Sequence, residues 1–171
     1  SPLEDALPVR LDPPSERRMP RGALVCVLHS IEMPNGPFWG KEVARKAAER
    51  LQPLDLIGLV EFTNFGGVDW VYRLQERGDG VEINRSIDNL TFGDMQDFDP
   101  SLELALAGLV AADAGQKHVI VISDGDPTIS RGVLQKYQNA GISMSTISVF
   151  PHTPADHRRM EQMAEATGGN F

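Results

Sequence analysis

The sequence predicts an α/β domain with a doubly wound, mostly parallel sheet of about six strands, helices on both faces and one antiparallel edge hairpin. Short apolar runs alternate with segments whose apolar residues recur at helical spacing. The first run, residues 23–28, is uninterrupted, which is typical of a strand buried on both faces. Gly66 and Gly67 separate the second run from the third closely enough for a hairpin.

The expected elements follow one another in a regular order. Residues 1–21 are rich in proline and lack periodicity, so we expect an arm or linker ahead of a domain over residues 22–171. Strands are expected over residues 23–28, 55–62, 68–74, 118–123 and 142–150, with Asn170 and Phe171 entering a sixth strand that the chain barely reaches. Helices are expected over residues 41–51, 81–90, 101–112, 132–139 and 154–167.

Local signals indicate where several helices begin and end. Asp99 suits the N-cap of the helix over 101–112, and Pro100 suits its first turn. Gly141 is placed to end the helix over 132–139. Thr153 is placed to cap the last helix.

Charge and composition argue against several classes of function. The formal net charge is −8 and the pI is about 4.9, whereas nucleic acids and anionic membranes are bound through Lys and Arg. No stretch approaches the roughly 20 apolar residues of a membrane span, and no apolar leader is visible at the N-terminus. The single cysteine, Cys26, excludes an intrachain disulfide and is expected to be an inert core residue. The cellular compartment stays open.

Ligands of such sheets bind at the carboxyl ends of the strands. Neither a glycine-rich phosphate loop nor a G-x-S-x-G nucleophile turn follows an expected strand. The sharpest motif is D-x-D-x-T at 124–128, as in haloacid-dehalogenase-like phosphohydrolases, where Asp124 would attack phosphorus and Asp126 would act as acid and base beside Mg²⁺. That motif belongs to the first strand of its fold, and too little chain follows it here. A metal-assisted phosphohydrolase is therefore an alternative hypothesis.

The order of elements and five local patterns resemble the von Willebrand factor type A (vWA) domain. The matching segments are the apolar run at 23–28, the D-x-h-x-h-h-x-F strand at 55–62, the helix at 99–109, the strand with a terminal D-G at 119–125 and the A-x-x-x-G-G-x-F pattern at 164–171. The resemblance covers residues 20–171 and is strongest for vWA domains embedded in large bacterial membrane-anchored proteins. It implies an interaction module.

Typical vWA domains hold a divalent cation in a metal-ion-dependent adhesion site (MIDAS). Its ligands are a D-x-S-x-S motif after the first strand, a Thr from the middle loop and an Asp after the fourth strand. Placed without gaps, these positions fall on His29, Ile31, Met33, Gln96 and Asp124. Only Asp124 keeps the oxygen ligand of the standard site, and His29 suits Zn²⁺ or other transition metals better. The resemblance therefore implies a vWA domain whose standard site is largely lost.

Several carboxylates on neighbouring loops are candidates for a cation site with a non-standard set of ligands. They are Glu32, Asp94, Asp97, Asp99, Asp124 and Asp126. If a metal binds, we expect Mg²⁺ or Ca²⁺ on Asp97, Asp124 and Asp126. In the competing interpretation, which we favour, Asp99 caps a helix, backbone N–H groups satisfy Asp124, and no cofactor is bound.

Aromatic residues lie near the same strand ends. The candidate contact rim comprises Phe38, Trp39, Phe65 and Phe98, with Phe92 beside them. Such residues form either a surface for a protein partner or a plug for the crevice that the missing metal leaves. We assign no role to His118, His152 and His157, and we expect Trp70 and Tyr72 to pack within the domain.

The leading hypothesis is a non-enzymatic protein–protein interaction module, without catalytic residues, in a larger membrane-anchored bacterial protein. It would bind a protein partner or neighbouring domains of the same chain, without nucleic acid and without inserting into the membrane itself. A purely structural role is the further alternative, and burial of Phe38, Trp39 and Phe65 within the domain would favour it.

Overall fold

Parallel pairing of four strands sets the architecture. The computed structural model describes residues 20–29, 35–63 and 67–171. Within them the strands lie in the order β3-β2-β1-β4-β5, all parallel except for the β2–β3 pair at one edge. The strands are β1 (Gly22–Leu28), β2 (Leu56–Thr63), β3 (Gly67–Glu76), β4 (Gln116–Ser123) and β5 (Ser143–Ser148). The helices are α1 (Gly36–Glu49), α2 (Val81–Asp88), α3 (Asp99–Ala111), α4 (Arg131–Ala140) and α5 (Pro154–Thr167). The predicted α/β class and mostly parallel sheet are confirmed.

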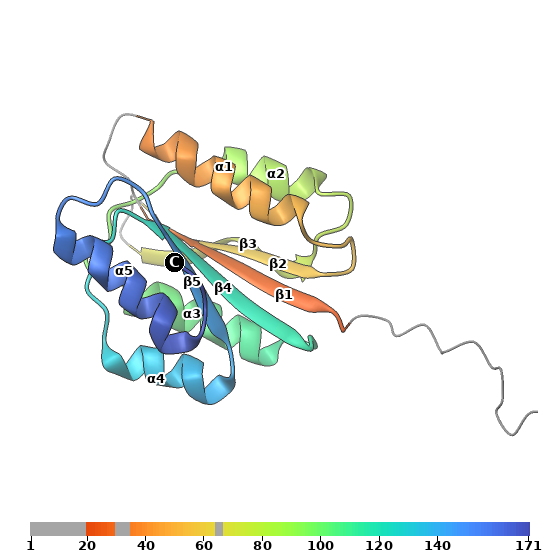
Figure 1. Ribbon diagram of the computed structural model, residues 1–171. Coiled ribbons are helices and arrows are strands. Elements are labelled where there is room, and N and C mark those ends of the chain that lie inside the picture. The colour runs from red at the N-terminus through yellow and green to blue at the C-terminus, as the bar shows by residue number, and fades with distance from the viewer. Residues whose placement is uncertain (1–19, 30–34, 64–66) are drawn as a thin grey trace, which may run out of the picture.

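Each face of the sheet has its own core (Figure 1). On one face α3, α4 and α5 pack on the strands, and Val25 shares a cluster with Leu109 and Tyr137. On the other face α1 and α2 pack on the strands, and Cys26 shares a cluster with residues such as Ala44. β1 lies between the two cores, so its side chains are buried on both sides, as its uninterrupted apolar run predicts.

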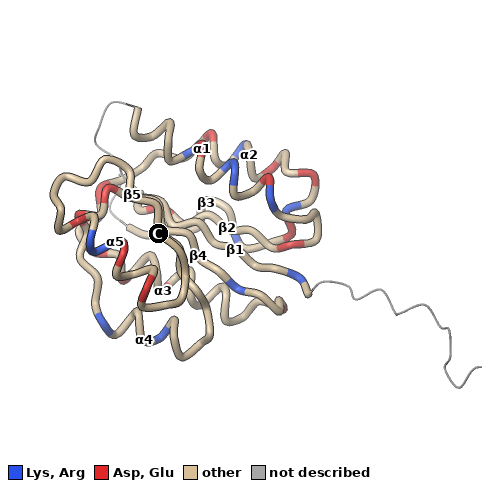
Figure 2. The backbone as a smooth tube through the Cα atoms, viewed as in Figure 1, with Lys and Arg blue, Asp and Glu red and all other residues tan. Residues whose placement is uncertain are grey.

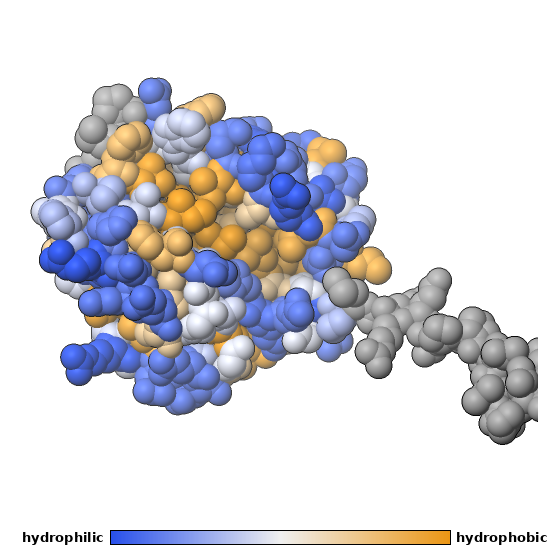
Figure 3. Space-filling model, viewed as in Figure 1, coloured by the Kyte–Doolittle hydropathy of each residue, from blue (hydrophilic) through white to orange (hydrophobic). Residues whose placement is uncertain are grey.

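The face covered by α1 and α2 remains partly open. Figure 3 shows apolar side chains on the sheet between α1 and α5. A groove of about 350 Å³ on this side is lined by the apolar residues Leu24, Ala47, Leu51 and Ile120. Charged residues of both signs are interspersed along the helices (Figure 2), and Arg45 of α1 pairs with Asp88 of α2 at 3.0 Å.

The predicted sixth strand is not formed within the described residues, because Asn170 and Phe171 are not in a strand. The chain nevertheless reaches the free edge of β5, where the Thr146 N–H donates to the Asn170 carbonyl at 2.9 Å. Another boundary differs at α1, which begins at Gly36, five residues before the expected start. Asn35 precedes it in the left-handed conformation, and Pro37 lies in its first turn, where proline needs no N–H partner.

Most predicted helix ends are confirmed, with one correction. Thr153 caps α5 in a reciprocal capping box with Asp156, and Gly141 ends α4 with a φ of 64°. The prediction that Asp99 is an N-cap is wrong. Asp99 is already the first residue of α3, and its N–H donates to the Asp97 carboxylate at 2.9 Å. The N-cap position is Phe98, which makes no side-chain cap, and the carboxylate of Asp99 accepts instead from the Ser130 N–H.

Trp70 and Tyr72 pack within the domain, as the sequence predicts. Trp70 on β3 lies over Gly58 and Gly108, since a Cβ at either glycine would fall within 3 Å of the indole ring. Tyr72 is buried against the opposite core. Cys26 is fully buried, and burial raises the pKa of its thiol to about 12, so the thiol is inert as expected.

No helix in the described parts of the chain is long and apolar enough to cross a membrane.

Candidate functional site

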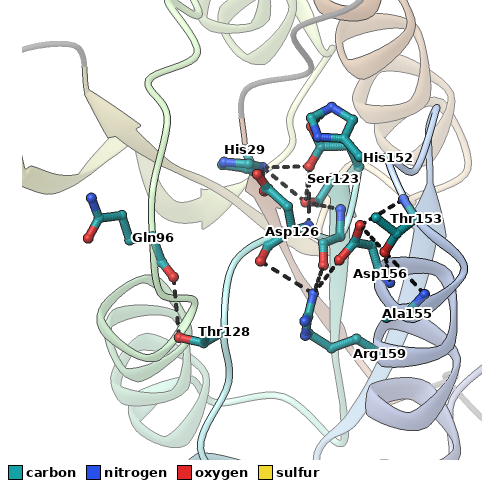
Figure 4. A network of polar contacts seen from close by, with 12 residues as sticks. His29, Gln96, Ser123, Asp126, Thr128, His152, Thr153, Ala155, Asp156 and Arg159 are labelled. Carbon is teal, nitrogen blue, oxygen red and sulfur yellow. Dashed lines mark hydrogen bonds and ion pairs between the residues drawn. The ribbon is translucent and has the colours of Figure 1, made fainter.

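Three parallel strands deliver polar side chains to one edge of the sheet. β1, β4 and β5 end there, and the loops that follow them carry His29, Asp126 and His152 (Figure 4). Asp124 directly follows the last residue of β4. Pairing of Leu28 with Ile122 sets the register between β1 and β4. The His29 N–H continues that ladder by donating to the Ile122 carbonyl at 3.1 Å, which places the imidazole beside the end of β4.

His29 is the centre of this group. Its side chain is 1% exposed. Nδ1 lies 3.0 Å from Ser123 Oγ, 3.3 Å from Asp124 Oδ1 and 3.9 Å from Asp126 Oδ1. Nε2 lies 3.3 Å from Asp94 Oδ1 on the loop before α3. One ring nitrogen thus faces two carboxylates and the other faces a third, an arrangement that fixes the orientation of the ring.

Asp124 is buried without a full set of hydrogen bonds. Its Oδ1 accepts weakly from Ser123 Oγ and from the Asp126 N–H, each at 3.4 Å. Its Oδ2 has no hydrogen-bond partner among the described residues, and His152 Nε2 lies 3.6 Å from it. We expected backbone N–H groups to satisfy this carboxylate, and that expectation is wrong for the described residues, of which only Asp126 donates a backbone N–H, at 3.4 Å.

The turn that carries Asp126 is held rigidly from both sides. Gly125 has a φ of 91°, and its N–H donates to Ser123 Oγ at 2.9 Å. Arg159 of α5 donates to the carbonyl groups of Gly125 and Asp126, and it pairs with Asp156 at 2.9 Å. A Cβ at Gly125 would lie 2.7 Å from the Asp156 carbonyl, so only glycine fits this close approach.

The electrostatics of the cluster follow from burial and from its mixed charges. Burial tends to raise the pKa of Asp124, but the hydrogen bond and charge of His29 and the hydrogen bonds to Asp126 together hold this pKa below its ordinary value. Burial tends to lower the pKa of His29, but contact with Asp124 and Asp94 raises it overall. Burial and the nearby Asp124 charge raise the pKa of Asp126. His29 and Asp124 therefore stabilise each other's charged forms.

Several predicted site residues lie away from this cluster. Asp97, expected as a third carboxylate ligand, is occupied by its bond to the Asp99 N–H. Gln96 contributes its backbone carbonyl, which accepts from the N–H and the hydroxyl of Thr128, while its side chain points away from His29 (Figure 4). Three further predicted positions and one candidate ligand lie outside the described residues: Ile31, Met33, Phe65 and Glu32.

The aromatic residues divide into two groups. Phe98, predicted on the contact rim, is fully buried and meets the His29 ring edge to face, so that assignment is wrong. Phe92 is buried as well. Phe38 and Trp39 are 54% and 48% exposed and meet edge to face at the start of α1, with ring centroids 5.3 Å apart. Phe98 and Phe92 thus fill the interior, and Phe38 and Trp39 do not.

Sequence reasoning missed three contributors. His152, which was assigned no role, lies beside Asp124, and the signal for it was its position just after the fifth strand. Arg159 contacts the turn after β4 from α5, three elements later in the chain, and no local pattern marks it. Phe150 is 46% exposed and follows β5, so it belongs to the same edge of the sheet as Phe38.

Comparisons with known proteins agree with this fold. Two bacterial structures share the fold across most of both chains: an aerotolerance-related membrane protein from Bacteroides fragilis (TM-score 0.66, 11% identity, 88% of this chain and 90% of that chain) and BatB from Bacteroides thetaiotaomicron (0.68, 12%, 88% and 88%). Proximal thread matrix protein 1 from the mussel byssus, with a zinc-occupied MIDAS motif, is also similar (0.61, 13%, 86% of this chain and 46% of that chain).

No curated protein sequence matches the chain. The family model for the von Willebrand factor type A domain matches residues 35–171, which is most of the chain. This chain therefore belongs to the von Willebrand factor type A domain family.

Proposed function

We propose that this chain is a non-enzymatic protein–protein interaction module that contacts its partner through the edge of the sheet where β1 and β5 end. The exposed pair of Phe38 and Trp39 is the observation that carries the proposal. Phe150 extends the same edge. We define the contact rim as these three residues. The partner is a protein or a neighbouring domain of the same parent chain.

Energetics favour a partner over solvent at this rim. Large aromatic side chains bury some 150–250 Å² each when they are covered, and aromatic residues are enriched at protein interfaces. Phe38 and Trp39 are both about half exposed although they contact each other. Because they lie on the first turn of a regular helix, the helix presents them in a fixed orientation and little ordering is needed on binding.

The residues present do not fit the Mg²⁺ of a standard adhesion site. Mg²⁺ prefers near-octahedral oxygen ligands, whereas the first ligand position holds the imidazole of His29 and the Gln96 side chain points away. The proposed contact therefore uses apolar surface and assigns no role to Mg²⁺ or Ca²⁺. The phosphohydrolase alternative is not proposed, because Asp124, which would attack phosphorus, is 1% exposed and faces His29.

A membrane-anchored parent protein belongs to the same proposal. One of the similar structures is a membrane protein, and the chain matches it over 88% of its own length. In such a parent this domain would stand outside the bilayer and bind other proteins.

Comparative affinity capture tests the proposed contact rim. Extract of the source cells is passed over the immobilised chain, over the double variant Phe38→Ser, Trp39→Ser and over the control Val110→Ser. Val110 is 57% exposed on α3, away from this rim, so the control removes comparable exposed apolar surface. We expect a protein that the chain and the control retain and the double variant loses. Equal retention by all three, or no retained protein, would contradict the proposal.

A further inference from the structure

The cluster at the end of β4 has the composition of a metal site of another class. His29, Asp124 and Asp126 each offer one ligand atom, and these atoms all lie within 4.8 Å of one another. Imidazole nitrogen combined with carboxylate oxygen suits Zn²⁺ and related transition-metal ions, whereas Mg²⁺ and Ca²⁺ prefer oxygen alone. The replacement that removes the standard site therefore introduces the donor that a transition metal selects.

The separations within the cluster are equal to, or at most about 0.6 Å longer than, those of ligands on a shared ion. Two ligands that each lie about 2.0–2.1 Å from a tetrahedral Zn²⁺ are separated from each other by roughly 3.3–3.4 Å. His29 Nδ1 lies 3.3 Å from Asp124 Oδ1 and 3.9 Å from Asp126 Oδ1. His152 Nε2 lies 3.6 Å from Asp124 Oδ2. Small side-chain rotations bring such atoms onto one ion without moving the strands.

An unpaired buried oxygen points to a ligand that the protein alone does not provide. Asp124 Oδ2 has no hydrogen bond to any residue that the structure describes, although its side chain is 1% exposed. Leaving a buried carboxylate oxygen unpaired is unfavourable, because the oxygen loses its water without gaining a hydrogen bond. A cation bound between Asp124 and its neighbours would satisfy this oxygen.

The outer contacts of His29 also match those of a metal-bound imidazole. Histidines that bind metals almost always donate the other ring N–H to a carboxylate or carbonyl, which fixes the tautomer. His29 Nε2 faces Asp94 at 3.3 Å, leaving Nδ1 directed at Asp124 and Asp126. Arg159 meanwhile fixes the backbone of the turn that carries Asp126.

We propose that His29, Asp124 and Asp126 bind a transition-metal dication of the Zn²⁺ class, with His152 supplying a fourth ligand from the solvent side. The His152 side chain is 39% exposed on the loop before α5, so it can turn toward the ion. The site is independent of the aromatic contact rim, because none of its ligands is an aromatic of that rim.

Metal binding to the chain itself tests this site. Tag-free protein is stripped with EDTA, and Zn²⁺, Co²⁺ and Mg²⁺ are titrated separately by calorimetry and in thermal unfolding. We expect one Zn²⁺ per chain and a Tm that rises by several degrees, with no rise for Mg²⁺ at the same concentration. Visible absorption of the Co²⁺ form should show the strong bands of a four-coordinate ion.

Two matched aspartate variants distinguish this ligand set from a general acidic surface. Asp126→Asn changes a ligand that is 40% exposed, so the fold should survive, and we expect Zn²⁺ affinity to fall by about tenfold or more. Asp97→Asn makes the same charge change on a nearby loop, and Asn keeps an oxygen for the Asp99 N–H. This control should bind Zn²⁺ as the unmodified chain does. Asp94→Asn should weaken binding by about 10–100-fold without removing a ligand.

Three outcomes would overturn the proposal: no Zn²⁺ or Co²⁺ binding, equal losses in Asp126→Asn and Asp97→Asn, or Mg²⁺ binding as tightly as Zn²⁺. None of these outcomes bears on the capture experiment with the Phe38 and Trp39 variants. Failure of the metal site and failure of the contact rim are therefore distinguishable.

Discussion

Two buried aspartates, Asp124 and Asp156, lie near the turn at Gly125 and differ in how many hydrogen bonds their carboxylates accept. Asp156 at the start of α5 accepts from the Thr153 N–H at 2.9 Å and from its hydroxyl at 2.7 Å, and it pairs with Arg159 at 2.9 Å. Asp124 at the end of β4 has no contact to a side chain or N–H group shorter than 3.3 Å among the described residues. The carboxylate of Asp156 is hydrogen-bonded within α5 and its cap, whereas one carboxylate oxygen of Asp124 has no hydrogen-bond partner among the described residues.

The difference distinguishes the helix-capping carboxylate of Asp156 from the carboxylate of Asp124, which we propose binds a metal ion. The hydrogen bond from Thr153 and the contact with Arg159 hold the pKa of Asp156 below its ordinary value, so it stays ionised as part of a helix cap. Asp124 is ionised because His29 faces it, but one of its oxygens remains without a hydrogen bond within the described chain. The hydrogen bonds of Asp156 stabilise the helix cap, whereas the unpaired oxygen of Asp124 is the observation that supports the proposed metal site.

The largest expected effect is the loss of zinc stabilisation in Asp124→Asn. At a free Zn²⁺ concentration of 100 times Kd, the bound ion should add about 2.7 kcal/mol to the free energy of unfolding. Asp124→Asn should remove this increment, because an amide is a poor ligand in place of a carboxylate. Asp156→Asn should retain it. Urea unfolding with and without Zn²⁺ measures all three proteins, and an increment that survives in Asp124→Asn would contradict the comparison.

The second effect concerns the turn between the two aspartates. Gly125→Ala should destabilise the chain by about 2 kcal/mol, since a left-handed residue with a Cβ costs about 1–2 kcal/mol and this Cβ would also meet the Asp156 carbonyl at 2.7 Å. Gly141→Ala is the matched control. Its φ of 64° is similarly left-handed, but nothing lies within 4 Å of its Cβ, so about 1 kcal/mol is expected. Equal losses of unfolding free energy in the two variants would show that the contact between the Gly125 backbone and the Asp156 carbonyl does not contribute.

A smaller effect is expected from the helix cap itself. Asp156→Ala removes the reciprocal bond of the capping box and should lower the free energy of unfolding by about 1 kcal/mol. The loss should be the same in EDTA and in Zn²⁺, because Asp156 is not a ligand of the proposed site. A loss of unfolding free energy that differs between EDTA and Zn²⁺ would mean that Asp156 contributes to metal binding together with Asp124.

The smallest effect is a pH dependence that Asp156 contributes. Its pKa is lower in the folded chain than the ordinary value of about 3.9. The stabilisation is therefore present above that value and is lost as the pH falls through the lowered pKa. In EDTA, the stability difference between the unmodified chain and Asp156→Asn should shrink as the pH is lowered from about 5. A difference that grows on acidification would contradict this sign.

The architecture was predictable from the sequence because it depends on local patterns. The apolar runs at β1 and β4 are long and uninterrupted, and the capping signals at Thr153 and Gly141 act within a few residues. The early start of α1 was missed because Gly36 and Pro37 resemble a loop, although both are tolerated in a first turn.

The candidate site was only half predictable, because its contacts depend on how distant loops converge. Strand order placed His29 and Asp124 at one edge, and their register made them neighbours. Whether Phe98 pointed outward or into the core depended on the path of the loop before α3, which no periodicity specifies. The approach of His152 and Arg159 likewise depends on the packing of α5 against the β4 turn.

Nitrogen NMR of the His29 ring tests the central claim most directly. On addition of Zn²⁺ at neutral pH, Nδ1 should lose its proton and shift to a metal-bound position, while Nε2 keeps its proton beside Asp94. The same addition should leave the ring of His29 unchanged in Asp126→Asn at low Zn²⁺. If both ring nitrogens stay protonated at saturating Zn²⁺, His29 is itself the permanent cation that neutralises Asp124, and the transition-metal site is contradicted.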